Sequence, residues 1–472
     1  MNIKKILSYS FGPFGAALIG FITLPIMTWY YTQEDVGKYN LFQIMISLSI
    51  IVVSCGMHQS YVREYHELEN KNELIKPSLF PGTLAIILLI LVSYFTKFSL
   101  SFILFDVYNK ELELYLFLAI VCSFYINILT HILRMKERAI AFSMTKLLPK
   151  ITFFIALILI VSFDNYRSYL ELIKLTAFTL LISLVIFIYL LRKDLTAGLK
   201  ASFRNVLMIK MLKFGSPLII GGLAYWALTA VDRILLKEMS GFEEVAIYSV
   251  STSIVSALSI LTTIFASIWH PKIYHWAREG IDKAKIELIV NTTCITVILI
   301  WTFVGIFSWV VDCFLPSDYS QVSSLIIGCV AMPLIYLLSE TTVIGIGISK
   351  KTIYSVYCSV TAFLINIVLN YLLIPEYMAL GAVVASLISF LVLFILRTEF
   401  SCLTWMSIKR TKVYISVLSL CLITIIHISD LIAYKYMVAI WIMNLLMSIY
   451  FHKKTIKVLY KVLISKYIGQ NT

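Results

Sequence analysis

The sequence is poor in charged residues. Of its 472 residues only 14% are Asp, Glu, Lys or Arg, whereas 60% are hydrophobic. Soluble domains carry about 25% charged residues. A water-soluble fold of this size could not bury so much apolar surface, so lipid must solvate most of it. The composition therefore predicts an integral membrane protein.

The sequence also lacks paired cysteines, catalytic motifs and glycine-rich loops. Its eight cysteines are scattered singly, which indicates neither a disulfide framework nor a metal site. Its seven histidines form no HExxH, and residues 345–347 (GIG) are too short for a phosphate-binding loop. No connection is long enough for a nucleotide-binding domain, which argues against an ATP-driven pump. We expect a transporter without metal or cofactor, and no enzyme.

Long apolar runs dominate what is present. Runs of about 20 apolar residues bounded by charges predict helices that cross a bilayer. The sequence thus predicts an all-α, polytopic membrane protein with about 14 transmembrane helices. They are expected near 9–31, 39–60, 79–97, 112–133, 146–163, 171–191, 214–236, 245–270, 288–311, 322–345, 353–374, 377–396, 413–430 and 433–451.

The basic residues are distributed unevenly over the expected loops. Most of the 39 Lys and Arg fall on the N-terminal side of the membrane, such as Arg134, Lys146 and Lys150 in one connection and Lys453 and Lys454 in the tail. This is the positive-inside pattern, so both termini are expected in the cytoplasm. The net charge of +13 follows the topology, and no nucleic-acid partner is expected.

The two halves of the chain share a sequence pattern. One shift of the sequence aligns the pairs Val36/Val245, Tyr39/Tyr248, Tyr65/Tyr274 and His66/His275, and places Arg63 on Lys272. Six spans separate equivalent helices, which predicts parallel repeats, with chance identity as the alternative. We expect two pseudo-symmetric six-helix lobes, at 1–200 and 201–400, and two further helices with a basic tail at 401–472.

Polar side chains recur at helical spacing inside several expected spans. Lipid penalises such stripes, so they must face protein or water. They either bond helix to helix or line a cavity. The stripes are Asn40, Gln43, Ser47, Ser54 and His58 in the second helix; Ser249, Thr252 and Ser256 in the eighth; Ser123, Asn127, His131 and Arg134 in the fourth; and Asn366 and Asn370 in the eleventh.

Three charged residues fall within or near the ends of spans. Asp232 and Arg233 are adjacent and therefore do not share a helix face. Arg233 is a candidate for contacting a phosphate, with an interfacial pair as the alternative. Glu340 is the one acid inside a span, either as a site for a proton or sodium ion or as the counter-charge of a buried Arg. Asp232 and Glu340 are the candidates for ion coupling.

These features together resemble the multidrug/oligosaccharidyl-lipid/polysaccharide (MOP) flippase superfamily, which includes the MATE transporters. Within it the chain looks most like the Wzx-type flippases of O-antigen repeat units. Besides Arg63, the resemblance rests on residues 7–12 (LSYSFG), 36–39 (VGKY), 231–236 (VDRILL), 245–249 (VAIYS) and 344–352 (IGIGISKKT).

The resemblance implies transport of an undecaprenyl-diphosphate-linked glycan between the leaflets of the bacterial inner membrane, by alternating access of two lobes. A polysaccharide polymerase and a chain-length regulator are the implied partners. On this hypothesis Arg63, Arg134, Arg233 and Lys272 attract the diphosphate. The stripes at Asn40/Gln43 and Ser249/Thr252 would meet sugar hydroxyls.

Other functions remain open from the sequence. A multidrug exporter, or a flippase for another lipid-linked precursor, would share the superfamily and the topology. A drug exporter for cations would need acidic cavity residues, for which only Glu340 and Asp232 qualify. A membrane-embedded polymerase or ligase is a different class and is expected to carry one large outer loop, which the sequence does not predict. A structural membrane scaffold is disfavoured by the polar stripes.

Overall fold

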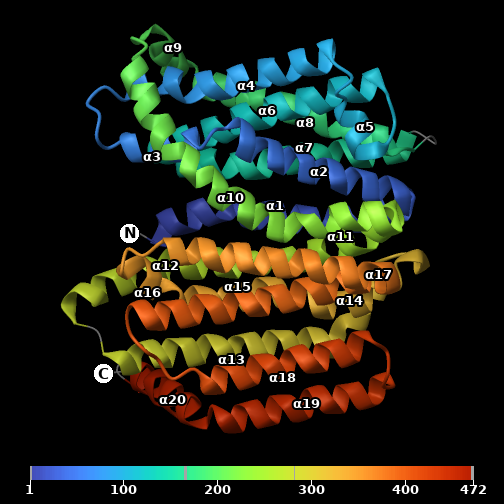
Figure 1. Ribbon diagram of the computed structural model, residues 1–472, viewed down its shortest axis with the longest axis vertical. Helices are drawn as coiled ribbons and strands as arrows, with labels where there is room; N and C mark the ends of the chain where they lie inside the picture. The colour runs from blue at the N-terminus through green and yellow to red at the C-terminus, as the bar shows by residue number, and fades with distance from the viewer. Residues whose placement is uncertain (1–2, 164–166, 281, 469–472) are drawn as a thin grey trace. The chain divides into compact units, whose positions relative to one another are not determined.

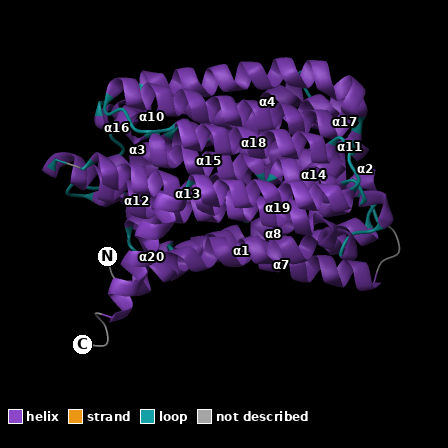
Figure 2. Cartoon of the chain, turned by 90° about the horizontal axis from the view of Figure 1, so that it is seen from below, coloured by secondary structure: helices purple, strands orange, loops and turns teal. Residues whose placement is uncertain are grey.

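The computed structural model describes residues 3–163, 167–280 and 282–468. Over these residues every regular element is a helix and none is a strand, which confirms the predicted all-α fold (Figure 2). Among the described residues, thirteen helical segments are long and apolar enough to cross a membrane. One of them, α17 (Ile353–Thr404), contains two predicted spans, because Met378 breaks the helix with φ 51° and ψ −129°. All predicted spans are therefore accounted for.

The chain divides into two compact units, and the first comprises Met1–Ile234 and Gly241–Ala246. Its most buried span is α6, which packs against α2, α4, α7 and α8 (Figure 1). The helices of this unit are α1 (Ile3–Tyr30), α2 (Gln33–Val53), α3 (Met57–Glu64), α4 (Ile75–Phe95), α5 (Leu100–Phe105), α6 (Lys110–Met135), α7 (Ala139–Phe163), α8 (Tyr169–Leu190), α9 (Arg192–Lys200) and most of α10 (Asn205–Ser240), with a 3-10 turn at Lys71–Leu74.

The second unit comprises Leu235–Ser240 and Ile247–Thr472. Its most buried span consists of α14 and α15, and α15 packs against α12, α13 and α17. The helices are most of α11 (Phe242–Ser256), α12 (Ser259–Glu279), α13 (Lys283–Phe307), α14 (Val322–Cys329), α15 (Ala331–Thr342), α16 (Ile344–Ile348), α17, α18 (Thr411–Ile428), α19 (Tyr434–Phe451) and α20 (Lys453–Ile468), with 3-10 turns at Ser308–Cys313 and Ser317–Tyr319.

The most buried spans correspond to the fourth and tenth predicted helices. In chain order they are six spans apart, the spacing that the predicted parallel repeats would give to equivalent helices. The contact-based division into units does not test the repeat boundaries at residues 200 and 400, which stay predictions.

Three helix boundaries differ from those expected. Helix α7 begins at Ala139 and not near residue 146, so Lys146 and Lys150 belong to the helix and not to a loop. The second and eighth predicted helices are each divided, into α2 and α3 and into α11 and α12. Helix α10 begins at Asn205 and not near residue 214, and a separate short helix, α9, ends before it at Lys200.

Glycine residues lie at two of these positions, the break between α2 and α3 and the contact of α7 with α1. The break between α2 and α3 contains Gly56 at φ +68°, a left-handed conformation, and its Cα lies against the backbone of Gly215, where a Cβ would lie 2.1 Å from the carbonyl oxygen. The early start of α7 coincides with its packing on α1. At Gly12 an added Cβ would lie 2.2 Å from the Ser143 carbonyl oxygen, so the two backbones meet directly.

We predict that Gly12→Ala lowers the thermal unfolding midpoint of the purified protein in detergent. The added methyl group forces α1 away from the α7 backbone, and overpacking of this kind costs about 1–3 kcal/mol. Gly20→Ala on the same helix is the matched control, because a Cβ there meets nothing within 4 Å. Equal midpoints for the two variants would contradict the close α1–α7 approach.

Candidate functional site

The polar stripe on α2 bonds this helix to its neighbours in the first unit. Gln43 Nε2 donates to the Tyr39 hydroxyl at 2.6 Å, which in turn lies 3.1 Å from Thr176 Oγ1 on α8. Ser47 is exposed and accepts a bond of 2.9 Å from Trp226 Nε1 on α10. Asn40 donates to the Val36 carbonyl of its own helix at 2.8 Å. The same stripe therefore contains a residue linked to a neighbouring helix, Gln43, and an exposed residue, Ser47.

The stripe on α11 is more enclosed. Ser249 is buried, and Thr252 Oγ1 donates to the Tyr248 and Ser249 carbonyls, each at 3.0 Å. Ser256 is exposed one turn further along and donates to the Ser253 carbonyl at 2.7 Å. Such bonds to the preceding turn satisfy a hydroxyl group without a partner helix.

The two asparagines of α17 lie before the break at Met378 and are fully buried. Asn370 Nδ2 donates to Asn366 Oδ1 at 3.1 Å, and Asn366 Nδ2 lies 3.4 Å from Ser386 Oγ, which follows the break. These amides therefore connect the two halves of α17. A buried polar network of this kind fixes the geometry of a helix break because each group is costly to leave unpaired.

The four basic residues expected at the diphosphate have different environments. The guanidinium of Arg63, on α3, lies over the Phe214 ring at 4.3 Å, and the Lys272 ammonium, on α12, lies over Trp276 at 4.8 Å. Arg134 is exposed in the last turn of α6. Arg233 Nη1 donates to the Thr229 carbonyl of α10 at 3.1 Å.

Asp232 and Arg233 differ in burial although they are adjacent. Asp232 is fully buried in α10, whereas Arg233 is half-buried. Adjacent residues of a helix point about 100° apart, which explains the difference. Helix α10 continues to Ser240, so this pair lies inside the helix and not at its end.

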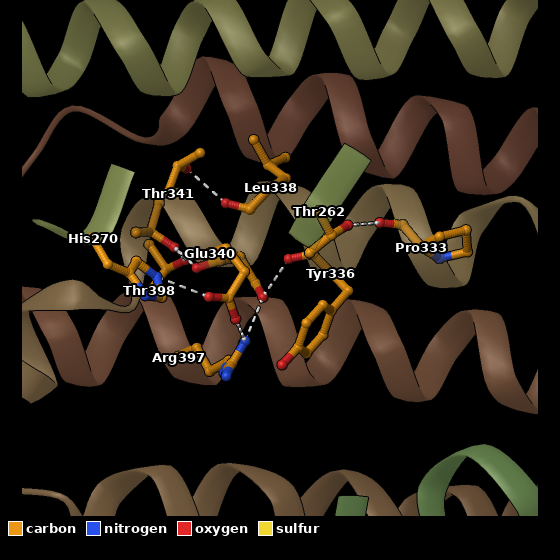
Figure 3. A network of polar contacts seen from close by, with 11 residues as sticks. Thr262, His270, Pro333, Tyr336, Leu338, Glu340, Thr341, Arg397 and Thr398 are labelled. Atoms are coloured by element: carbon orange, nitrogen blue, oxygen red, sulfur yellow. Dashed lines mark hydrogen bonds and ion pairs between the residues drawn. The ribbon is translucent and has the colours of Figure 1, made fainter. Parts of the chain in front are cut away.

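Glu340 lies in a polar network of the second unit (Figure 3). Its Oε1 accepts a bond of 2.9 Å from Arg397 Nη1, and its Oε2 lies 3.0 Å from His270 Nε2. Arg397 also donates to Ser339 Oγ at 2.7 Å, and its guanidinium lies over the Tyr336 ring. The side chains of Glu340 and Arg397 are 8% and 15% exposed, so the ion pair is largely removed from solvent. The side chain of His270 is 39% exposed, so His270 is the more accessible of the two residues that contact the Glu340 carboxylate.

Sequence reasoning missed Arg397 as the partner of Glu340. The predicted twelfth span ended at residue 396, which placed Arg397 just outside the membrane, but α17 continues to Thr404. The sequence signal that could have revealed the pair was Glu340 within one expected span and Arg397 directly after the end of another. Of the two interpretations of Glu340, the contacts match the counter-charge of a buried Arg.

A second group of polar side chains lies in the first unit, around α6. The His58 and His131 rings, from α3 and α6, have centroids 5.0 Å apart. His58 Nδ1 lies 3.2 Å from Ser54 Oγ, and burial lowers the pKa of His58 below its ordinary value. Arg134 follows His131 by three residues on α6, and Lys146 lies on α7, which packs against α6. Sequence reasoning missed Lys146 here because it placed this residue at the start of the expected span 146–163 and counted its charge with the preceding connection.

The fold as a whole is all-α and polytopic. It is similar to that of the lipid II flippase MurJ in an inward closed conformation, with a TM-score of 0.70 and 16% identity over 95% of this chain and 99% of that one. It is also similar to an inward-facing multidrug resistance MATE transporter of the MOP superfamily, with a TM-score of 0.59 and 12% identity over 84% and 97%. At these identities the likeness concerns the fold.

The family follows from the sequence itself. The profile of the family described as "polysaccharide biosynthesis protein" matches residues 3–275, more than half of the chain. The chain belongs to this family. An uncharacterized membrane protein of Methanocaldococcus jannaschii is 22% identical over 424 residues, which cover 82% of this chain and 81% of the relative. The family match confirms the expected link to polysaccharide biosynthesis, and the similar folds confirm the predicted all-α, polytopic architecture.

We predict that Glu340→Gln and Arg397→Gln each destabilise the protein strongly. Either change leaves a buried partner uncompensated, which costs about 3–5 kcal/mol. The double variant should lose less than the sum of the two, as a coupled pair requires. Thermal unfolding in detergent measures all three. Glu34→Gln, which breaks the more exposed pair with Lys38, serves as control and should cost no more than about 1 kcal/mol. Additive losses at 340 and 397 would disprove the pairing.

Proposed function

We propose that this protein is a flippase that moves undecaprenyl-diphosphate-linked oligosaccharide repeat units, of O-antigen or a similar surface polysaccharide, from the cytoplasmic to the periplasmic leaflet of the bacterial inner membrane. The observation that carries the proposal is membership of the polysaccharide biosynthesis protein family over residues 3–275. The fold, shared with a protein named as a lipid II flippase, supports it further.

The physical problem of such a substrate fits the chemistry of the chain. A diphosphate and its sugars cannot cross hydrocarbon unaided, because a charge transferred from water into an apolar medium is strongly penalised. The polyprenyl tail, in contrast, can stay in the bilayer. The protein therefore has to offer positive charge and hydrogen-bond partners to the headgroup alone.

The chain places cations inside its apolar segments. Lys146 and Lys150 lie one turn apart on α7 and are exposed, and Arg134 is exposed in the last turn of α6. Within the described residues none of these three forms an ion pair with a carboxylate. Arg63, Arg233 and Lys272 add positive charge on α3, α10 and α12. Of these, Arg63 lies 4.0 Å from Glu67 Oε1. A cation without a counter-charge is costly in a membrane, and an anionic ligand would compensate it.

Export of cationic drugs is the alternative in the same superfamily. It requires a carboxylate free to receive the cation. The carboxylate of Glu340 is occupied by Arg397 and faces His270, which disfavours this alternative. Asp232 is fully buried in α10. The balance of charge favours an anionic substrate.

We predict that Arg63→Ala and Arg233→Ala each reduce transport about tenfold or more, because a hydrogen bond to a charged group contributes about 1.5–3 kcal/mol. The assay uses proteoliposomes that contain the full chain and a fluorescent polyprenyl-diphosphate disaccharide, with quenching of the label exposed in the outer leaflet. Arg63→Lys and Arg233→Lys keep the charge and should retain more activity. In cells, surface polysaccharide at matched expression is the second readout. Undiminished transport in both Ala variants would remove these residues from the mechanism.

We also propose that both termini lie in the cytoplasm. Fusion of green fluorescent protein to the C-terminus should be fluorescent, and fusion of alkaline phosphatase at the same point should be inactive, because the basic tail with Lys453, Lys454 and Lys457 is retained inside. A phosphatase fusion in the connection between α18 and α19, near Asp430, should be active. The opposite pattern would invert the topology. A polymerase and a chain-length regulator are the partners that this function would require.

A further inference from the structure

Two histidines face one another in the first unit. His58 comes from α3 and His131 from α6, two helices that pack together, and their ring centroids are 5.0 Å apart. Both are half-buried. Each ring nitrogen of a neutral imidazole either donates or accepts one hydrogen bond, and both donate once the ring is protonated. The pair is therefore able to change from acceptor to donor by taking up a proton.

Two buried polar atoms, one in this pair and one next to it, have no hydrogen-bond partner among the described residues. His131 Nδ1 and Asn127 Nδ2 form no hydrogen bond with any described residue. They lie four residues apart on α6 and thus on the same face of the helix. An unpaired buried polar atom costs about 1–3 kcal/mol, so native structures normally pair such atoms or reserve them for a ligand. Both atoms are suited to donate to an oxygen, one of them after protonation.

The charge around the pair has one sign. Arg134 from α6, Lys146 from α7 and His58 from α3 act on His131. His58 in turn contacts the uncharged Ser54, the residue that follows α2. Neither α4 nor α8, which also pack against α6, contributes a charge that acts on His131 within the described residues. None of the four basic groups forms an ion pair in this part of the chain. The cluster lacks an anion.

We propose that His58, His131, Asn127 and Lys146 form a subsite for a diphosphate group, and that the histidine pair takes up a proton when the diphosphate binds. The inference rests on the proposed function, since it assigns the subsite to the headgroup of the lipid-linked substrate. Arg134 adds positive charge at its edge. The proton comes from solution and goes to an imidazole nitrogen, and no covalent bond is made or broken.

The direction of the proton uptake follows from electrostatics. Without a ligand, burial lowers the pKa of His58 and so disfavours a positive charge on it. A diphosphate reverses this preference, because an anion within hydrogen-bond distance stabilises the imidazolium. Binding and protonation therefore support one another. Affinity is highest at low pH and declines as the pH rises through the pKa of the liganded pair.

Isothermal titration of the full chain in nanodiscs tests this inference, with farnesyl diphosphate as the probe. Between pH 8 and pH 6 the Kd should fall, by up to about tenfold for each pH unit and linked proton. Titrations in two buffers of different ionisation enthalpy should show proton uptake. His131→Asn should abolish the uptake and weaken binding about tenfold at pH 6. His66→Asn, which replaces an exposed histidine of the same unit, should change neither.

Inorganic pyrophosphate, as second probe, identifies the source of the diphosphate. It should show the same pH dependence with lower affinity, because the lipid-linked form also buries its chain. Tighter binding of pyrophosphate than of farnesyl diphosphate would assign the subsite to a soluble anion and overturn the assignment to the lipid. If His131→Asn does not fold, His58→Asn and the proton uptake of the unaltered chain decide the question.

Two outcomes separate this inference from the proposed function. Binding of farnesyl diphosphate that is independent of pH, together with intact transport of the lipid-linked glycan, overturns the histidine subsite alone. Absence of both binding and transport at every pH overturns the proposed function as well.

Discussion

Hydrocarbon offers no hydrogen bonds, and this constraint determines the rest of the structure. Every backbone amide and carbonyl within the membrane must be paired inside its own segment, which leaves helices as the solution for a chain of this composition. The same constraint applies to side chains. Gln43 bonds to Tyr39 and through it to Thr176, and the largely buried Glu340 pairs with Arg397. Polar groups in this protein are therefore informative wherever they are found.

The sequence was sufficient for the fold because the same constraint leaves a strong signal. Long apolar runs gave the spans, and the family match confirms the link to polysaccharide biosynthesis that the resemblance implied. Boundaries failed where a charge continued a helix. Lys146 and Arg397 were read as the limits of spans, although α7 and α17 extend past them. Hydropathy treats a cation as an interruption, whereas a helix accepts one wherever a neighbouring element or ligand compensates it.

The candidate site was less predictable for a related reason. Spacing along one helix identified the stripe of Asn127, His131 and Arg134, but which helix lies opposite depends on packing. The proximity of His58 and His131 requires the break at Gly56, which starts α3 where it meets α6. Likewise, Glu340 was recognised as unusual, whereas its partner was not, since 57 residues separate it from Arg397. Local patterns reveal which polar residues matter, and tertiary packing decides what they do.

The polar network around Glu340 and the cluster around His131 differ in whether their charges are neutralised within the protein. In the second unit, Glu340 and Arg397 neutralise each other and bind three helices, α12, α15 and α17, into one network. In the first unit, His58, His131, Lys146 and Arg134 have no counter-charge in the described chain. A compensated pair stabilises the fold whether or not a ligand is present. An uncompensated cluster gains its missing charge only when an anion arrives, so its energy depends on occupancy. The two units thus differ in chemistry: one holds an internally neutralised pair, and the other holds the cluster that we propose for an anionic headgroup.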